Sequence, residues 1–274
     1  GALDPLRRMI RHAILALGVL ASGAGITAEP RSPAEFDAAY ARLETAPGST
    51  NDPARLKALF DLTWRYQMVE SPETATSVGY PGLNDQWSDL SPAAMARRRQ
   101  EVRRSLRVLA TVDPGTLTPD ERLYRDLFER SLREQADGDR FPEELLAINQ
   151  MGGPQQEIAQ ILSLMPVQTA GDVENLLSRL QGASARIEAT QDLLREGLSR
   201  GVTPPQITLR DVPQQVLNNI PPDPDQSPLF RPFQSLPTSV PETEQETFRG
   251  RARGILTNAV YPSFRELHRF LTNT

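Results

Sequence analysis

The stretch that decides the fold is AGDVENLLSRLQGASARIEATQDLLREGLSR, residues 170–200. Its apolar residues recur at the three- and four-residue spacing of a single helix face. Gly201 follows the last of them and suits the left-handed conformation that ends many helices. At ~1.5 Å per residue, this helix would be roughly 45 Å long, with Gly182 as its candidate bend. The face consists of Val173, Leu176, Leu177, Leu180, Ile187, Leu194 and Leu198.

The starts of other helices are indicated by a capping residue directly before a proline. Such pairs favour the first turn of a helix, because proline needs no donor there. Ser32 with Glu35 and Thr118 with Glu121 also have the spacing of a capping box. The sequence therefore predicts a mostly α protein, a multi-helix array of amphipathic helices. The pairs are Ser32-Pro33, Asp52-Pro53, Ser71-Pro72, Ser91-Pro92 and Thr118-Pro119.

Within the helix that starts at Ser91, the arginine-rich segment ARRRQEVRR, residues 96–104, is expected to face water. After Gly201, TPPQITLRDV (203–212) predicts one short strand, because Ile207 and Leu209 alternate with polar residues. Residues 221–241 contain seven prolines, which disfavour regular structure. We expect an ordered, extended segment that its apolar side chains hold against the helices. A last helix should run from about Glu242 through Pro262.

Composition excludes several classes of protein. The 274 residues suffice for one large or two small domains, and the net charge of −5 argues against a nucleic-acid partner. Without cysteine there can be no disulfide, iron–sulfur cluster or thiolate zinc site. The only histidines are His12 and His268.

Residues 7–28 resemble a secretory signal. Three arginines precede the apolar run AILALGVLA (13–21), which is too short to span a bilayer. Cleavage after Ala28 and a start at Met9 are expected, which makes residues 1–28 a signal peptide with an N-terminal extension and 29–274 the mature helical region. A buried N-terminal helix is the alternative. The mature protein is expected to be exported, periplasmic or secreted, and free of the membrane.

No catalytic or metal-binding residue stands out. His268 lies beside the apolar stripe of the last helix and has no identifiable partner, so we interpret it as a half-exposed helix histidine. The carboxylates near helix starts fit the helix dipole and need no catalytic explanation. No phosphate-binding glycine loop, nucleophile elbow or H-E-x-x-H motif is present. Those carboxylates are Glu143, Glu144, Glu242, Glu244 and Glu246.

The polar stretch ESPETATSVGYPGLNDQWSDLS, residues 70–91, interrupts the helices. We interpret it as a structural turn, in which Asn84 and Asp85 bond nearby backbone and Trp87 pins the turn to neighbouring helices. The functional alternative places Asn84, Asp85 and Trp87 against a substrate. Two aromatic residues of the proline-rich segment, Phe230 and Phe233, are the other candidates for substrate contact.

Four segments together resemble a known family: residues 59–91, 112–128, 193–209 and 227–233. Their order and spacing, over about residues 50–271, are similar to the N-terminal half of bacterial proteins of the domain of unknown function 885 family. The resemblance implies a secreted, helical protein related to zinc metallopeptidases of the oligopeptidase and angiotensin-converting-enzyme kind. In those proteins two helical halves flank a channel, and an H-E-x-x-H helix of the C-terminal half binds zinc.

This sequence contains no such helix, so no catalytic residue and no zinc ligand can be carried over. It stops at Thr274, about where the family would continue into its second half. We therefore expect the N-terminal, non-catalytic half of a peptidase-like protein, forming one wall of a peptide-binding channel and inactive alone. Its partners would be the missing C-terminal half and a peptide substrate, with zinc held only by the complete protein. The alternative is a stand-alone helical binding or scaffold module without enzymatic activity.

Overall fold

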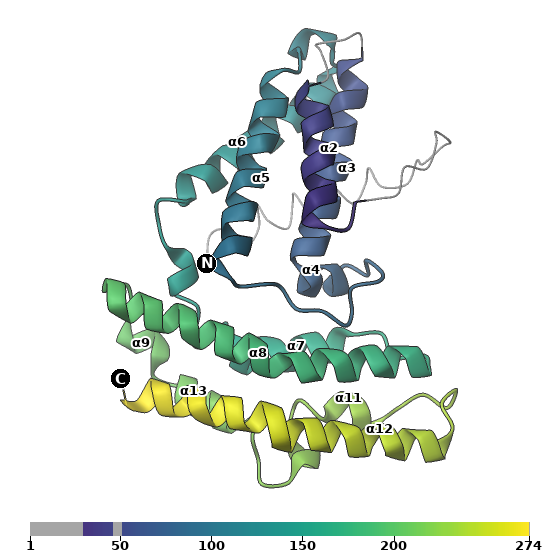
Figure 1. Cartoon of the computed structure of the whole chain (residues 1–274), viewed down its shortest axis with the longest axis vertical. Helices are drawn as coiled ribbons and strands as arrows, with labels where there is room; N and C mark the ends of the chain where they lie inside the picture. Colours follow the sequence, from purple (N-terminus) through teal and green to yellow (C-terminus); the bar gives the residue numbers. More distant parts are fainter. Residues whose placement is uncertain (1–29, 46–50, 274) are drawn as a thin grey trace. The chain divides into compact units, whose positions relative to one another are not determined.

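The computed structural model describes residues 30–45 and 51–273 (Figure 1). Helices dominate this part of the chain, which confirms the predicted mostly α class. The chain forms two compact units. Unit 1 consists of the residues up to Glu70 together with Met95–Arg140, and unit 2 consists of Ser71–Ala94 and Phe141–Thr274. The expected signal segment, residues 1–28, lies outside the described residues.

Unit 1 is a small bundle of helices around an aromatic centre. Tyr66 meets Phe36 and Tyr40 edge-on, at centroid distances of 5.1 and 6.5 Å. In Figure 1, α2 and α3 lie side by side, and the two helices are in contact. The elements are α2 (Pro33–Thr45), α3 (Asp52–Glu70), most of α5 (Pro92–Ala110), η1 (Pro114–Thr116) and α6 (Pro119–Gly138).

Unit 2 is organised by the long helix α8 (Ala170–Arg200), which contacts α7 and also the helices near the C-terminal end of the chain (Figure 1). Twelve of its residues are buried, so it forms the centre of this unit's core. The other elements are α4 (Pro72–Ser77), η2 (Glu143–Leu145), α7 (Pro154–Leu164), α9 (Gln206–Leu209), α10 (Val212–Leu217), η3 (Pro224–Gln226), α11 (Arg231–Gln234), α12 (Glu242–Ile255), η4 (Leu256–Val260) and α13 (Tyr261–Asn273).

The predicted boundaries of α8 are confirmed. Thr169 and Asp172 form a capping box at its start, and Gly201 ends it with a φ of 69°. Gly182 has a packing role here, because a Cβ atom at this position would lie 2.9 Å from Cδ1 of Trp87. The absence of a side chain thus makes room for an indole ring.

The predicted strand is wrong. Residues 206–209 and 212–217 form two short helices, α9 and α10. Val212 and Val216, four residues apart, are both buried, whereas Ile207 is 66% exposed, so burial follows a helical spacing and not an alternating one. Within the described residues, the only β-type pairing is an isolated bridge between Asn149 and Gly152.

The proline-rich segment is ordered and anchored, as expected. Leu229, Phe230 and Phe233 are fully buried, and the two phenylalanine rings stack at 5.8 Å. The segment is less extended than predicted, because it contains the turn η3 and the one-turn helix α11.

The last helix is interrupted as well. A π-turn, η4, separates α12 from α13 directly before Pro262. Proline has no N–H for the carbonyl of Asn258, and a local change of helix type accommodates that missing donor.

One predicted cap is corrected. Asp52 already belongs to α3, and Asn51 caps this helix by accepting the backbone N–H of Ala54 at 3.3 Å. Asp52 instead pairs with Arg55 at 3.0 Å and accepts the backbone N–H of Asp113 at 2.9 Å.

Candidate functional site

The polar stretch between α4 and α5 folds around a buried arginine of α8, Arg179, whose exposure is 0%. Its Nε donates to the carbonyl of Gln86 at 2.9 Å, and its Nη1 donates to the hydroxyl of Thr76 at 2.6 Å. Its Nη2 donates to the carbonyls of Pro72, Leu83 and Gln86 at 3.3, 3.0 and 2.7 Å. Three of these five hydrogen bonds therefore go to backbone carbonyls of the loop, and the other two go to α4.

Trp87 closes the arrangement from the other side. Its indole Nε1 donates to the carbonyl of Arg179 at 2.7 Å, and the Arg179 guanidinium lies 5.4 Å from the indole ring centroid. The ring also occupies the space that Gly182 leaves free. The structural interpretation of Trp87, that it pins the turn to a helix, is confirmed.

Burial lowers the pKa of Arg179 to about 10, and the charges of Glu73 and Asp85 act in the opposite direction. The guanidinium thus remains charged at neutral pH. Glu73 is itself held in place, because its carboxylate accepts the backbone N–H of Ser88 at 3.1 Å. The loop, its acids and Arg179 form one electrostatic unit.

The candidate contact residues of the sequence occupy different environments within unit 2. Asn84 is half-buried and accepts the hydroxyl of Thr76 at 2.8 Å, whereas Asp85 is exposed. Trp87 is half-buried. Phe230 and Phe233 are only 1% and 0% exposed, so they lie in the core and present no surface to a ligand.

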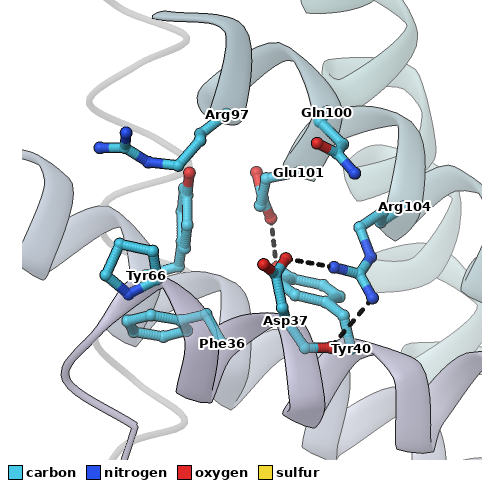
Figure 2. Close-up of a pocket in the computed structure, with 9 residues that line it drawn as sticks. Phe36, Asp37, Tyr40, Tyr66, Arg97, Gln100, Glu101 and Arg104 are labelled. Atoms are coloured by element: carbon cyan, nitrogen blue, oxygen red, sulfur yellow. Dashed lines mark hydrogen bonds and ion pairs between the residues drawn. The ribbon is translucent and has the colours of Figure 1, made fainter. Parts of the chain in front are cut away.

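A second polar site lies in unit 1, and the sequence analysis missed it (Figure 2). It is a small cavity of about 40 Å³ with residues of α2, α3 and α5 around it. The arginine-rich segment expected to face water contributes to its walls, since Glu101 and Arg104 are each only 8% exposed. The lining residues are Pro33, Phe36, Asp37, Tyr40, Tyr66, Arg97, Gln100, Glu101 and Arg104.

Hydroxyl groups surround the Glu101 carboxyl. Its Oε1 accepts the hydroxyl of Tyr40 and that of Ser105, the latter at 2.9 Å. The hydroxyls of Tyr40 and Thr63 are 3.3 Å apart, which joins all three helices in one network. Burial raises the pKa of Glu101 above its usual value, although these hydrogen bonds lower it. The carboxyl is therefore easier to protonate than a surface one.

Arg104 connects α5 to α2 beside this network. Its Nη1 bonds Asp37 at 2.6 Å, and its Nη2 bonds Glu44 at 3.2 Å. The guanidinium lies 5.2 Å from the ring centroid of Tyr40. Such a position fits a cation–π contact.

A signal for this site exists in the sequence. Residues 101, 105, 108 and 112 follow helical spacing, and the last two are valines. All four are buried, which places Glu101 and Ser105 on the apolar face of α5.

The side chains that could bind zinc are not clustered in the described residues. Those residues contain no group of three or more His, Cys, Asp or Glu side chains arranged to hold a metal ion. His268 is half-buried on α13. Structural and catalytic zinc sites use three or four such ligands, and we assign no reaction step to a metal here.

These features define a mostly helical protein whose described residues include two internal polar clusters. Residues 72–274 match the family described as "Bacterial protein of unknown function (DUF885)", and the chain belongs to that family. The resemblance inferred from the sequence is confirmed to this extent. No curated protein matches the chain significantly.

A solved structure also resembles the chain, described as "the putative lipoprotein from Colwellia psychrerythraea". The TM-score is 0.73 at 13% identity, and the match covers 82% of this chain. At that identity the likeness shows the fold alone. The chain spans only 42% of the length of that structure.

Proposed function

We propose that the chain is the N-terminal, non-catalytic half of an exported, zinc-metallopeptidase-like DUF885 protein, and that it forms one wall of a peptide-binding channel. The observation that carries this proposal is the unequal coverage of the structural match, 82% of this chain against 42% of the lipoprotein. This chain therefore corresponds to less than half of a larger protein of the same fold. Such coverage is expected if the chain is one half of a protein that functions together with a second half.

The loop held by Arg179 is the proposed peptide contact. It is fixed to α8 through both Arg179 and Trp87, yet Asp85 is exposed on it. A rigid loop loses little conformational entropy on binding, which favours its use as a binding surface. Asn84, Asp85 and the half-buried ring of Trp87 would contact the peptide, while catalysis would depend on residues outside this chain.

Export is part of the proposal. The basic and apolar pattern of residues 7–28 supports it, and so does the lipoprotein description of the structural neighbour. Among the described residues, we find no helix with the length and apolar character needed to cross a membrane. The proposed location is the periplasm or the medium.

Metal analysis and a peptidase assay on the purified chain test the catalytic part of the proposal. We expect no stoichiometric zinc and no hydrolysis of a mixed peptide library. Turnover that a chelator abolishes would contradict the proposal. The coding DNA beyond Thr274 gives an independent check: an in-frame H-E-x-x-H motif supports it, and a stop codon favours the stand-alone binding module.

Peptide binding is tested by calorimetry with Asp85→Asn. If the loop contacts peptide, affinity for a cationic peptide should fall by several-fold. Asp192→Asn is the matched control, because Asp192 is a 74% exposed carboxylate on α8 that pairs with Arg195. Equal affinities for both variants would remove the loop from the proposed channel wall.

A further inference from the structure

The pocket of unit 1 contains buried hydrogen-bond donors that have no acceptor. Among the described residues, the hydroxyl of Tyr66 and the Nε of Arg97 are both buried without a hydrogen-bond partner. Both residues line the same cavity. A buried donor that stays unpaired loses its hydrogen bond to water and gains none in return, so native proteins rarely leave two of them together.

Tyr66 keeps its proton and can therefore donate. Burial raises the pKa of its phenol, and the negative charges of Glu70 and Glu101 raise it further. The residue is only 8% exposed, and Figure 2 shows its hydroxyl end directed toward the side of the pocket where Arg97 and Glu101 lie. This hydroxyl points into the cavity and not into solvent.

Arg97 is held in position by the neighbouring helix. Its Nη2 lies 3.5 Å from Oε1 of Glu70 on α3, so the terminal end of the guanidinium is already paired. The Nε–H is on the same edge of the guanidinium as Nη2, yet it remains without an acceptor. The ion pair thus leaves one donor of Arg97 for a second partner.

The size of the cavity limits what can enter. A volume of about 40 Å³ admits a group of very few heavy atoms. Since one water needs at least about 10–15 Å³, the space corresponds to two or three waters or to one carboxylate group. The rings of Phe36, Tyr40 and Tyr66 form the apolar part of the wall.

We propose that this pocket binds one small carboxylate group, with the Tyr66 hydroxyl and the Arg97 Nε–H as its two donors. A carboxylate has two acceptor oxygens in a plane, one for each donor, and charge-assisted hydrogen bonds of this kind are the strong ones. Two arginines, Arg97 and Arg104, and two acids, Asp37 and Glu101, line the pocket, so the two donors and not a net positive charge would hold the carboxylate. The site is independent of the proposed peptide contact, because it lies wholly in unit 1.

Nuclear magnetic resonance of the full chain with 13C-labelled tyrosine rings tests the proposal. The chain has five tyrosines, and the Tyr66→Phe variant identifies the Tyr66 signal. The ligands are acetate and N-acetylglycine, with N-acetylglycinamide and sodium chloride at matched ionic strength as controls. We expect a saturable shift of the Tyr66 signal with at least one carboxylate, and none with the amide or with chloride.

Two substitutions separate hydrogen bonding from charge. Arg97→Met and Arg97→Lys should both weaken carboxylate binding by at least tenfold, because a lysine ammonium does not replace the Nε–H at its position. Arg103→Met is the matched control on the same helix, since Arg103 is outside the pocket and 60% exposed. Chemical-shift dispersion of the other tyrosines verifies that each variant is folded.

Binding of acetate alone assigns the site to free small acids, and binding of N-acetylglycine assigns it to the carboxylate of a peptide-like ligand. Either result supports the proposal. Equal shifts with the amide and with N-acetylglycine, no shift with either carboxylate, or unchanged binding by Arg97→Met would overturn it, and the cavity would then hold only water.

Discussion

Each unit of the molecule buries an ionisable side chain, but the two units provide different hydrogen-bond partners for it. Unit 1 buries an acid, Glu101, and surrounds it with hydroxyls from Tyr40 and Ser105. Unit 2 buries a base, Arg179, and surrounds it chiefly with backbone carbonyls of the loop that follows α4.

The difference follows from proton chemistry. A buried carboxyl can reduce its desolvation cost by binding a proton, and burial does raise the pKa of Glu101. Arg179 keeps its charge at neutral pH, even with its pKa lowered to about 10. Its surroundings must therefore provide an acceptor for each donor. For this reason Arg179 determines the course of a loop, whereas Glu101 orients a few hydroxyls.

The largest expected effect is the loss of Arg179. Arg179→Met fills similar space but leaves the carbonyl of Gln86 without the two guanidinium donors that it accepts, so we expect unfolding to become easier by about 3 kcal/mol. Chemical denaturation measures the loss, and limited proteolysis locates it in residues 80–90. Arg179→Lys should recover less than half, because one ammonium cannot reach all the acceptors of the guanidinium. A methionine variant within about 0.5 kcal/mol of wild type would mean that water replaces the guanidinium.

The next effect concerns the contact between Gly182 and Trp87. Gly182→Ala places a Cβ atom 2.9 Å from the indole, so Trp87 must move. Overpacking costs ~1–3 kcal/mol and exceeds the ~1 kcal/mol that alanine contributes to a helix. Gly250→Ala in α12 is the matched control: its Cβ meets nothing within 4 Å, so it should stabilise the protein. Equal thermal shifts in the two variants would show that the indole adapts freely.

A smaller effect tests the acid of unit 1. The pKa of Glu101 is raised above 4.5 in the folded state, so its contribution to stability is complete below pH 4.5 and is lost as the pH rises through the folded-state pKa. Glu101→Gln cannot ionise and should lack this loss. Its difference from wild type at neutral pH should stay below about 2 kcal/mol. Denaturation between pH 4 and 8 gives both curves, and parallel curves would contradict the assignment.

The smallest effect is expected on the surface of α6. Arg130 and Glu134 are 75% and 48% exposed and pair at 2.9 Å, four residues apart. Exposed pairs of this kind contribute ~0.3–0.5 kcal/mol, so Glu134→Gln should change stability by no more than that, and less in high salt. A loss above about 1 kcal/mol would give this surface pair the importance of a buried one.

The sequence predicted the parts of the fold that depend on neighbours along the chain. The capping boxes of Ser32 and Thr118 formed as predicted, because their hydrogen bonds join residues only three positions apart. The strand prediction at Ile207 failed because it also used only local sequence. A local alternation carries no information about which side chains tertiary packing will bury.

The sites depend on distant parts of the chain, which explains what was missed. The partners of Arg179 include Gln86 and Pro72, which are 93 and 107 positions away. Nothing near Arg179 in the sequence distinguishes it from a surface arginine. Glu101 was hidden differently, since the arginines around it suggested a solvated face although the spacing from Glu101 to Val108 and Val112 already placed it inward.

The π-turn η4 lies between α12 and α13, and the number of residues in it determines which side of α13 faces the core. Phe248, Ala252, Leu256, Val260 and Phe264 are all buried at constant steps of four. In an ordinary helix each such step overshoots a full turn by about 40°, so the row would spiral away. The wider turn takes up this excess for the one step from Leu256 to Val260. Thr257 and Asn258 are exposed and free to vary in identity, but a one-residue deletion here would rotate α13 by about 100° and carry Phe264 out of the core.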